Sequence, residues 1–288
     1  MEDIVVHGVD TDNSPYDCGS YASSTTYVTG MAVVKTCETL RKKICERGAE
    51  YLGCSPDDVE FDGEKVVNLK TKEEITRKEI GNKVMCSSNA PLSATEAFSS
   101  PVSPPPFMVG IAEVEIDKET GVVEPIDYAA VVDCGTVVNP NLARVQTEGG
   151  IAQGIGMALY EDIIYSEKGK NYSNSFMQYK IPSRLDVGEI RVEFESSYEP
   201  TGPFGAKSIG EIVINTPSPA ISNAVQNAVG VIVRELPITA EKVYKGMAEK
   251  NQSKYVKQYI KWRYTETACR PSRSKGKGIP SVCNVHRV

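Results

Sequence analysis

The sequence predicts an α+β protein of mixed sheets with packed helices, divided into two lobes. Three observations carry this prediction. Apolar residues recur with helical spacing in some segments, apolar and polar residues alternate in others, and a proline-rich stretch separates the two groups. The expected boundaries are 1–100 for the first lobe, 101–247 for the second and 248–288 for a basic tail. No internal repeat is evident.

The first lobe is expected to begin with a polar loop and a helix. Residues 14–28 are rich in small and hydroxyl side chains, which indicates a loop. A helix is expected from about Gly30 to Cys45. Its apolar residues repeat at the spacing of a buried helical stripe: Val33, Cys37, Leu40 and Ile44. A small hairpin is predicted at 59–68, and a charged helix at 71–80.

The second lobe follows an extended linker at 86–106, which is too rich in proline for a helix or a central strand. A hairpin is then expected from 108 to 132. A helix is predicted from Asn139-Pro140 to about Leu159, with small and apolar residues on one face: Leu142, Val145, Gly149, Ala152, Gly156 and Leu159. The last expected elements are a strand at 189–196, a helix that starts at Ser218-Pro219 and ends at Gly230, and a helix from Thr239 to about Met247.

Composition and charge are those of an ordinary globular protein. Hydrophobic residues make up 40% and charged residues 24% of the 288 residues, and no run reaches the roughly 20 apolar residues of a membrane span. The N-terminus lacks the features of a secretory signal, so a cytoplasmic location is expected.

The charge is distributed unevenly along the chain. Residues 248–288 hold ten Lys or Arg residues against two Glu residues, so the net charge of −6 becomes −14 for the rest of the chain. An acidic body argues against nucleic acid as a partner. The basic tail is expected to be a disordered extension, with a subunit-docking or nucleic-acid-binding tail as the alternative.

The cysteines and histidines exclude several metal sites. None of the eight cysteines forms a CxxC pair, so neither a zinc ribbon nor a ferredoxin-type cluster is indicated, and reduced thiols are expected. His7 and His286 are the only histidines. A His-based metal site or a His general base within this chain is therefore nearly excluded.

Two glycine-rich segments are candidate ligand sites. Residues 19–26 precede a predicted helix, whose free N–H groups and partial positive charge suit an anionic ligand, although for this segment alone a plain polar loop is the preferred interpretation. Residues 146–156 have no G-x-G-x-x-G directly after a strand, which excludes a Rossmann fingerprint. Gln146 and Gln153 can hydrogen-bond a heterocycle, whereas the glycines alone are explained by tight helix packing.

A third segment, 202–211, ends in a glutamate. Its lysine does not directly follow a glycine, as the P-loop motif demands. Glu211 stands beside three apolar residues, Ile209, Ile212 and Val213, and an apolar setting equips a carboxylate as a general base. A glutamate at a helix start that faces water is the alternative. Residues 131–140, where a strand gives way to a turn and a helix, are interpreted as structural.

The order and residue composition of these segments resemble those of the molybdenum-binding subunit of the xanthine dehydrogenase and aldehyde oxidase family. The resemblance runs from about Asp10 to Met247. Three strings carry it: Val-Val-Asp-Cys-Gly-Thr-Val-Val-Asn-Pro, Gln-Thr-Glu-Gly-Gly-Ile-Ala-Gln-Gly-Ile-Gly and Gly-Pro-Phe-Gly-Ala-Lys-Ser-Ile-Gly-Glu. It implies that the two lobes are those of a molybdopterin-binding domain.

The resemblance also implies a cofactor and site residues. In that family molybdenum is held by a pterin, in bacteria usually in the cytosine dinucleotide form, and not by side chains. The loop before the first helix contacts this cofactor, which here implies Tyr21, Ala22, Ser23, Ser24 and Thr25. The implied helix contact is Gln146, and the implied catalytic base is Glu211. The reaction expected is hydroxylation of an electron-poor ring carbon with oxygen from water.

Family catalytic chains are much longer, so partners are expected. They are a larger molybdopterin subunit, an iron–sulfur subunit with [2Fe-2S] centres and an FAD subunit, without which the chain is inactive. Xanthine or a related purine is the expected substrate. The alternatives are the medium molybdopterin subunit of a nicotinate dehydrogenase, and a truncated remnant without catalytic activity.

Overall fold

The computed structural model describes residues 4–8, 10–12, 14–17, 19–87 and 91–256. The helices are η1 (Tyr21–Ser23), α1 (Thr25–Leu52), η2 (Pro56–Asp58), α2 (Arg77–Met85), α3 (Pro140–Leu159), η3 (Pro203–Gly205), α4 (Ile212–Asn215), α5 (Pro217–Val229) and α6 (Ala240–Val256). The strands are β1 (Val59–Phe61), β2 (Lys65–Asn68), β3 (Glu74–Thr76), β4 (Phe107–Ile116), β5 (Val123–Asp133) and β6 (Glu189–Phe194). Two small sheets with packed helices confirm the predicted α+β class.

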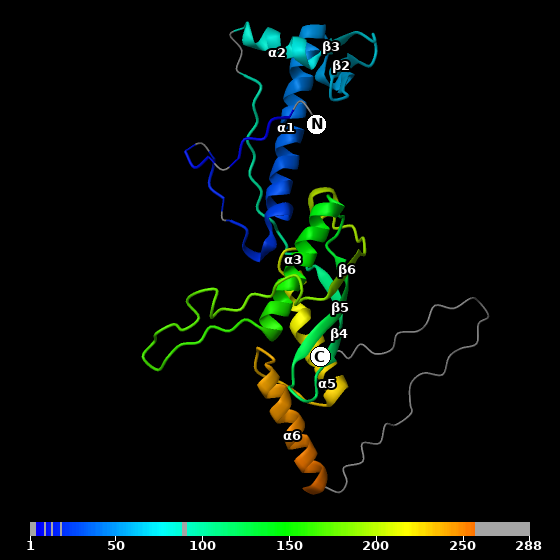
Figure 1. Ribbon diagram of the computed structural model, residues 1–288. Coiled ribbons are helices and arrows are strands. Elements are labelled where there is room, and N and C mark those ends of the chain that lie inside the picture. Colours follow the sequence, from blue (N-terminus) through cyan, green and yellow to red (C-terminus); the bar gives the residue numbers. More distant parts are fainter. Residues whose placement is uncertain (1–3, 9, 13, 18, 88–90, 257–288) are drawn as a thin grey trace, which may run out of the picture.

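The two sheets lie at different levels of an elongated molecule (Figure 1). Strands β1, β2 and β3 form an antiparallel sheet beside the C-terminal half of α1. In the second sheet β4 pairs antiparallel with β5, and β5 pairs parallel with β6. A parallel pair requires a long crossover, and the segment between β5 and β6 that contains α3 provides it.

Helix α1 is longer than the sequence predicts, and its packing differs. It continues past Cys45 and ends at Gly53, whose φ of +66° stops the helix in the left-handed conformation. The predicted stripe is covered only in its second half: Val33 is 56% exposed, whereas Leu40 and Ile44 are half-buried and Ile44 packs against the small core around Val66. Tyr27 and Gly48 are fully buried. The helix bridges two packed regions, and its middle contacts the linker.

The linker runs back along α1 and contains no helix or strand in its described part, as predicted. Lys43 Nζ donates to Ser93 O (2.6 Å). Closer to the start of α1, the Phe98 ring lies edge-on to Tyr27, with centroids 6.4 Å apart. These contacts attach the linker to the helix.

The helix predicted at 71–80 is wrong in its first half. Residues Glu74–Thr76 form β3, whose Ile75 side chain completes a small core with Val66, and α2 starts only at Arg77. Thr76 and Glu79 form a reciprocal capping box there, which fixes the start of the helix.

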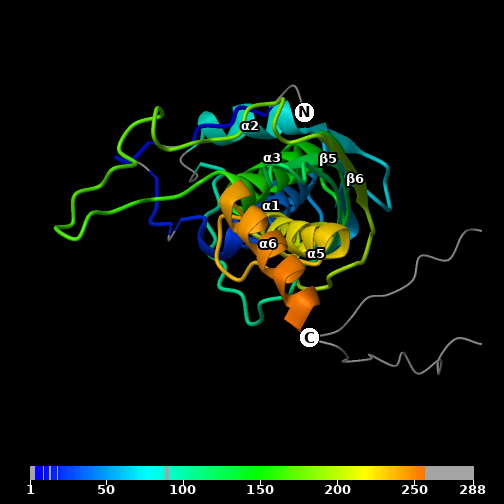
Figure 2. The same cartoon turned by 60° about the horizontal axis from the view of Figure 1, so that its bottom comes forward.

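Helices α3 and α5 cover one face of the second sheet (Figure 2). Tyr128 stands at the centre of this core and donates to Thr216 Oγ1 (2.8 Å), and burial raises its pKa to about 12. Gly110 makes room for it, because a Cβ there would lie 2.0 Å from the tyrosine oxygen. The outer face of the sheet exposes Val109 and Ile111.

Helix α3 has the predicted limits but buries a different face. Its buried residues include Gly150 and Gly154, where added Cβ atoms would lie 2.1 Å from Val213 and 2.6 Å from Pro217. The predicted face is wrong in its first half, since Leu142 and Val145 are each 67% exposed. Small residues do admit a close neighbour, but on the side that meets α4 and α5.

The last two helices differ from prediction at their ends. Helix α5 starts at Thr216-Pro217 instead of Ser218-Pro219, because Pro217 already supplies a favourable first helical position, and it ends at Gly230 as predicted. Helix α6 continues beyond Met247 to Val256. The rest of the basic tail, 257–288, lies outside the described residues.

Candidate cofactor pocket

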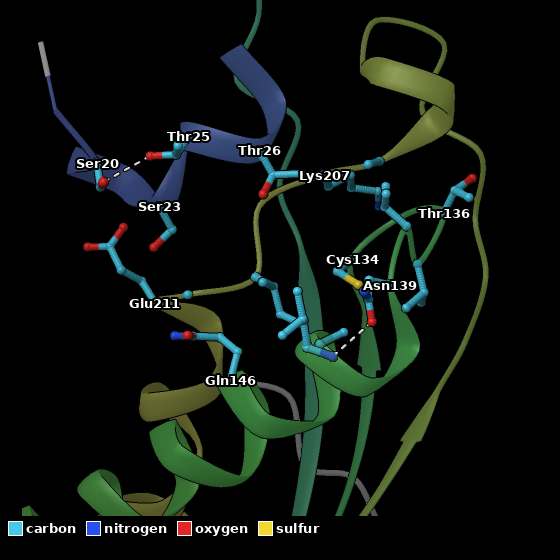
Figure 3. Close-up of a pocket in the computed structure, with 17 residues that line it drawn as sticks. Ser20, Ser23, Thr25, Thr26, Cys134, Thr136, Asn139, Gln146, Lys207 and Glu211 are labelled. Atoms are coloured by element: carbon cyan, nitrogen blue, oxygen red, sulfur yellow. Dashed lines mark hydrogen bonds between the residues drawn. The ribbon is translucent and has the colours of Figure 1, made fainter. Parts of the chain in front are cut away.

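A cavity of about 570 Å³ lies where three segments distant in sequence meet (Figure 3). They are the start of α1, the connection from β5 into α3, and the segment that leads into α4. The cavity is lined by Ser20, Ser23, Thr25, Thr26, Cys134, Thr136, Val137, Val138, Asn139, Leu142, Ala143, Gln146, Ala206, Lys207, Ile209, Gly210 and Glu211.

The first wall is the loop that ends in η1. Ala22 and Ser23 both adopt left-handed backbone conformations, with φ of 51° and 55°, which are costly for residues other than glycine. This bend ends at Ser24, and α1 begins at Thr25. The free N–H groups of the first turn of α1 therefore start at the cavity.

The second wall is the start of α3. Asn139 is its N-cap, with Oδ1 accepting from the Leu142 N–H (3.1 Å), and Pro140 occupies the first helical position. Gln146 follows within two turns and lines the cavity. Figure 3 shows its amide on the same side as Ser23 and Glu211.

The third wall is the segment that leads into α4, and backbone hydrogen bonds hold it to the end of β5. The Lys207 N–H donates to Cys134 O (2.7 Å), and the Thr136 N–H donates to Gly205 O (2.8 Å). Gly135 has a φ of +72°, and a Cβ there would lie 2.3 Å from Gly205 O. Residues 131–140 thus have the structural role that the sequence predicts, although Cys134, Thr136 and Asn139 also line the cavity.

An ion pair reinforces the same junction. Lys207, only 9% exposed, places Nζ 2.9 Å from Asp133 Oδ2, and Ser197 Oγ donates to Asp133 Oδ1 (2.6 Å). Partial burial alone would raise the pKa of Asp133. The hydrogen bonds from Ser197, from the Gly135 N–H and from Lys207 outweigh it, so this pKa lies below its usual value.

Gly210, on the third wall, lies close to residues of the other two walls. A Cβ there would lie 2.8 Å from Ser23 Oγ and 3.7 Å from Gln146 Nε2. Glu211 is the next residue. The structure therefore brings together four of the site residues expected from sequence: Ser23, Thr25, Gln146 and Glu211. Tyr21, Ala22 and Ser24 shape the loop but do not line the cavity.

The apolar setting expected for Glu211 is only partly present, because Ile209 lines the cavity with it but Ile212 and Val213 do not. Val213 is buried with Val132 and Cys134, and Ile212 packs against the same cluster, so these side chains lie away from the cavity. Glu211 is exposed, and as N-cap of the four-residue α4 it makes no capping hydrogen bond. Its carboxylate remains available to the cavity.

Sequence reasoning missed Lys207 and Thr136 as lining residues. Lys207 was considered only as part of a P-loop motif, which its position in the Gly-Ala-Lys-Ser fragment excluded. Its role depends on Asp133, 74 residues earlier, and no local pattern reveals that pairing.

Within the described ranges, no three His, Cys, Asp or Glu side chains gather as ligands for a metal ion. A search of the same residues finds no helix long and apolar enough to cross a bilayer.

Comparison with known proteins defines the class. Residues 1–188 match the family model of the molybdopterin cofactor-binding domain. The chain is 36% identical over 247 residues to the probable hypoxanthine oxidase XdhD of Escherichia coli K12, covering 84% of this chain and 25% of that protein. It is 31% identical over 249 residues to the gamma subunit of the 6-hydroxypseudooxynicotine dehydrogenase complex of Paenarthrobacter nicotinovorans. This match covers 83% of this chain and 31% of that subunit.

A solved structure has a similar fold. The Cu,Mo-CO dehydrogenase in its carbon monoxide-reduced state superimposes with a TM-score of 0.74 at 26% identity, covering 84% of this chain and 31% of that chain. This chain belongs to the molybdopterin cofactor-binding domain family. It corresponds to part of the large subunit of molybdenum hydroxylases and spans a quarter to a third of the length of the relatives it matches.

The residues at the cavity fit a molybdopterin. Its phosphate and pterin groups require hydrogen-bond donors, and the walls offer hydroxyl groups, the Gln146 amide and the N–H groups at the start of α1. Ser23, Gln146 and Glu211 have no side-chain hydrogen bond within the part of the chain that the structure describes. Their polar groups are therefore free to bind a ligand.

Proposed function

We propose that this chain is part of a molybdenum hydroxylase that hydroxylates an N-heterocycle, xanthine or a related purine, with oxygen from water. The active site is completed by another subunit. The observation that carries the proposal is the meeting of Ser23, Gln146 and Glu211 at one cavity. The bound molybdenum–molybdopterin, in the cytosine dinucleotide form, supplies Lewis-acid and redox chemistry.

The side chains have distinct roles in this proposal. Gln146, Ser23 and Thr25, which line the cavity, hold the cofactor through amide and hydroxyl groups. Tyr21, Ala22 and Ser24, which lie outside the lining, contact it from the bend of the loop in this proposal. Glu211 is the general base, and its exposed carboxylate accepts the proton released when water-derived oxygen is transferred. Because this chain leaves that carboxylate uncovered, the second subunit excludes water from it.

The substrate class is supported by a relative. The E. coli relative at 36% identity is described as a probable hypoxanthine oxidase, which favours a purine. The P. nicotinovorans relative at 31% identity is described as a 6-hydroxypseudooxynicotine dehydrogenase subunit, which keeps a nicotinate-type pyridine as the second candidate.

The electrons released require further centres. An iron–sulfur subunit with [2Fe-2S] centres and an FAD subunit take them up in this proposal, beside the larger molybdopterin subunit, and all are cytoplasmic. This chain offers no cluster of metal-ligating side chains among its described residues.

The test uses the complex that a tagged form of this chain retains when purified from its source cells. Molybdenum, iron and flavin are measured, and oxidation of xanthine, hypoxanthine and nicotinate is assayed with a dye acceptor. Glu211→Gln is expected to keep the molybdenum content and to lower turnover by about 10²–10⁴-fold. Glu195→Gln, an exposed glutamate away from the cavity, is the matched control and keeps full turnover. Near-normal turnover in the Glu211 variant would refute the assignment of the base.

A further inference from the structure

We infer that Tyr27 is a positioning residue, whose hydroxyl group fixes the first wall of the cavity to the third. This inference rests on the proposed function, in which these two walls supply the loop that holds the cofactor and the base Glu211. Tyr27 itself does not line the cavity. It acts on the site through the residues that it holds.

The Tyr27 hydroxyl connects segments that are far apart in the chain. Tyr27 lies in the first turn of α1, and it is only 3% exposed. Its oxygen lies 2.6 Å from Thr201 Oγ1, 174 residues later, and accepts a hydrogen bond from Ser100 Oγ (3.0 Å). Because the Thr201 hydroxyl donates to the Glu199 carboxylate, its oxygen is left to accept the tyrosine proton. The buried hydroxyl of Tyr27 is therefore paired both as donor and as acceptor.

The surroundings of the Tyr27 ring are tightly packed. A Cβ on Gly202 would lie 3.1 Å from the ring carbon Cδ2, and a Cβ on Gly30 would lie 2.9 Å from Pro203 Cγ. Helix α1 thereby contacts η3, which precedes the lining residues of the third wall. Phenylalanine would fill the same space as Tyr27 but would not bind Thr201. The hydroxyl therefore adds a hydrogen bond of defined length between two elements that are already in contact.

The segment that Tyr27 holds also carries Glu211, and side chains attach it to the rest of the chain at two points. Thr201 is attached to α1 by Tyr27, and Lys207 is attached to the end of β5 by Asp133. The attachment at Lys207 places the segment beside the connection from β5 into α3, which is the second wall. The attachment at Thr201 places it beside the first wall.

The attachment at Thr201 controls how closely Ser23 approaches Glu211. A Cβ on Gly210 would lie 2.8 Å from Ser23 Oγ, so the first and third walls nearly touch beside the glutamate. Figure 3 shows Ser23 and Glu211 on the same side of the cavity. Loss of the Tyr27 hydroxyl lets these walls separate, while Gln146 keeps its place on α3. Because a misplacement of about 1 Å can lower a rate by about 10²-fold, this separation reduces turnover.

The test uses the complex that a tagged full-length chain retains when purified from its source cells. Tyr27→Phe removes only the hydroxyl, Thr201→Val removes its partner, and Thr201→Ser keeps a hydroxyl there. Tyr160→Phe is the matched control, because the hydroxyl of this half-buried tyrosine donates to Asp186 O (3.2 Å), outside the cavity. Molybdenum content is measured, together with kcat and KM for the heterocycle that the wild type oxidises. Amide hydrogen exchange is measured for the peptides that form the first and third walls.

Tyr27→Phe and Thr201→Val are each expected to lower kcat by about 10–100-fold at unchanged KM and molybdenum content, and to speed amide exchange in both walls. The double variant is expected to be no slower than either single variant, since both remove the same hydrogen bond. Thr201→Ser and Tyr160→Phe are expected to keep the wild-type values. Full kcat in Tyr27→Phe overturns the inference, and so does an equal loss in Tyr160→Phe, and both results leave the proposed function standing. If the wild type shows neither molybdenum nor heterocycle oxidation, the proposed function fails, and the exchange rates alone decide whether Tyr27 joins the two walls.

Discussion

Lys207 Nζ lies 2.9 Å from Asp133 Oδ2, and this ion pair joins the segment that leads to Glu211 to the last residue of β5. The two side chains are 9% and 19% exposed. The same lysine also lies over the Phe107 ring, 5.5 Å from its centroid. The position of Glu211 at the cavity thus depends on a contact between residues that belong to different motifs.

Lys207→Met is expected to destabilise the chain by about 2–3 kcal/mol. The substitution leaves Asp133 without its cation, and the cost stays below that of a fully buried pair because Asp133 is partly exposed. Urea denaturation measures the loss. Lys245→Met, which removes an exposed ion pair with Glu241, is the control and leaves the midpoint unchanged. Equal midpoints for both variants would show that the Lys207 pair contributes nothing.

The stability that Asp133 contributes is expected to depend on pH. Its pKa is lowered in the folded state, so the contribution is fully present above the ordinary aspartate pKa of 3.8 and is lost as pH falls through the lowered folded value. Urea midpoints of the wild type and of Asp133→Asn should therefore differ most at neutral pH and converge below about pH 4. A difference that grows on acidification would contradict the assigned direction.

Two adjacent glycines of α3 are expected to respond to alanine in opposite directions. Gly149→Ala should stabilise the isolated chain by about 1 kcal/mol, because alanine favours the helix and open space receives the methyl group. Gly150→Ala should destabilise it by about 1–3 kcal/mol, since the Cβ would lie 2.1 Å from Val213 Cγ2. Thermal melting of the two variants checks the signs, and equal shifts would mean that the buried face of α3 is misassigned.

This glycine pair shows where sequence reasoning stops. Asn139-Pro140 predicts the start of α3 because capping is local chemistry, and the hairpin of β4 and β5 follows from alternation around one turn. The sequence did not predict which face of α3 is buried. Leu142, Val145 and Gly149 on one face repeat as regularly as Gly150, Gly154 and Ala158 on the other. Packing against Val213 and Pro217, both distant in sequence, decides between the two faces.

The candidate site likewise has features that the sequence predicted and features that only the fold determines. Its residue types were visible in the motifs, whereas the expectation that the loop, Gln146 and Glu211 share one ligand came from the resemblance to the xanthine dehydrogenase and aldehyde oxidase family. The sequence left Glu211 open between an apolar setting and a helix start that faces water. The fold decides for exposure, because Ile212 and Val213 turn into the core under the cavity. The ion pair of Lys207 with Asp133 is likewise a product of the fold.

The thiol of Cys134 is expected to resist modification in the folded chain. It is 4% exposed beneath the cavity, and burial raises its pKa, so little thiolate forms near neutral pH. Cys37 and Cys86 are exposed and serve as internal controls. Iodoacetamide labelling followed by peptide mass spectrometry should show Cys134 reacting about 100-fold more slowly than these two, the factor that a local opening free energy of about 3 kcal/mol imposes. Labelling of Cys134 at the rate of Cys86 would mean that the turn after β5 does not hold its packing on Val132 and Val213 in solution.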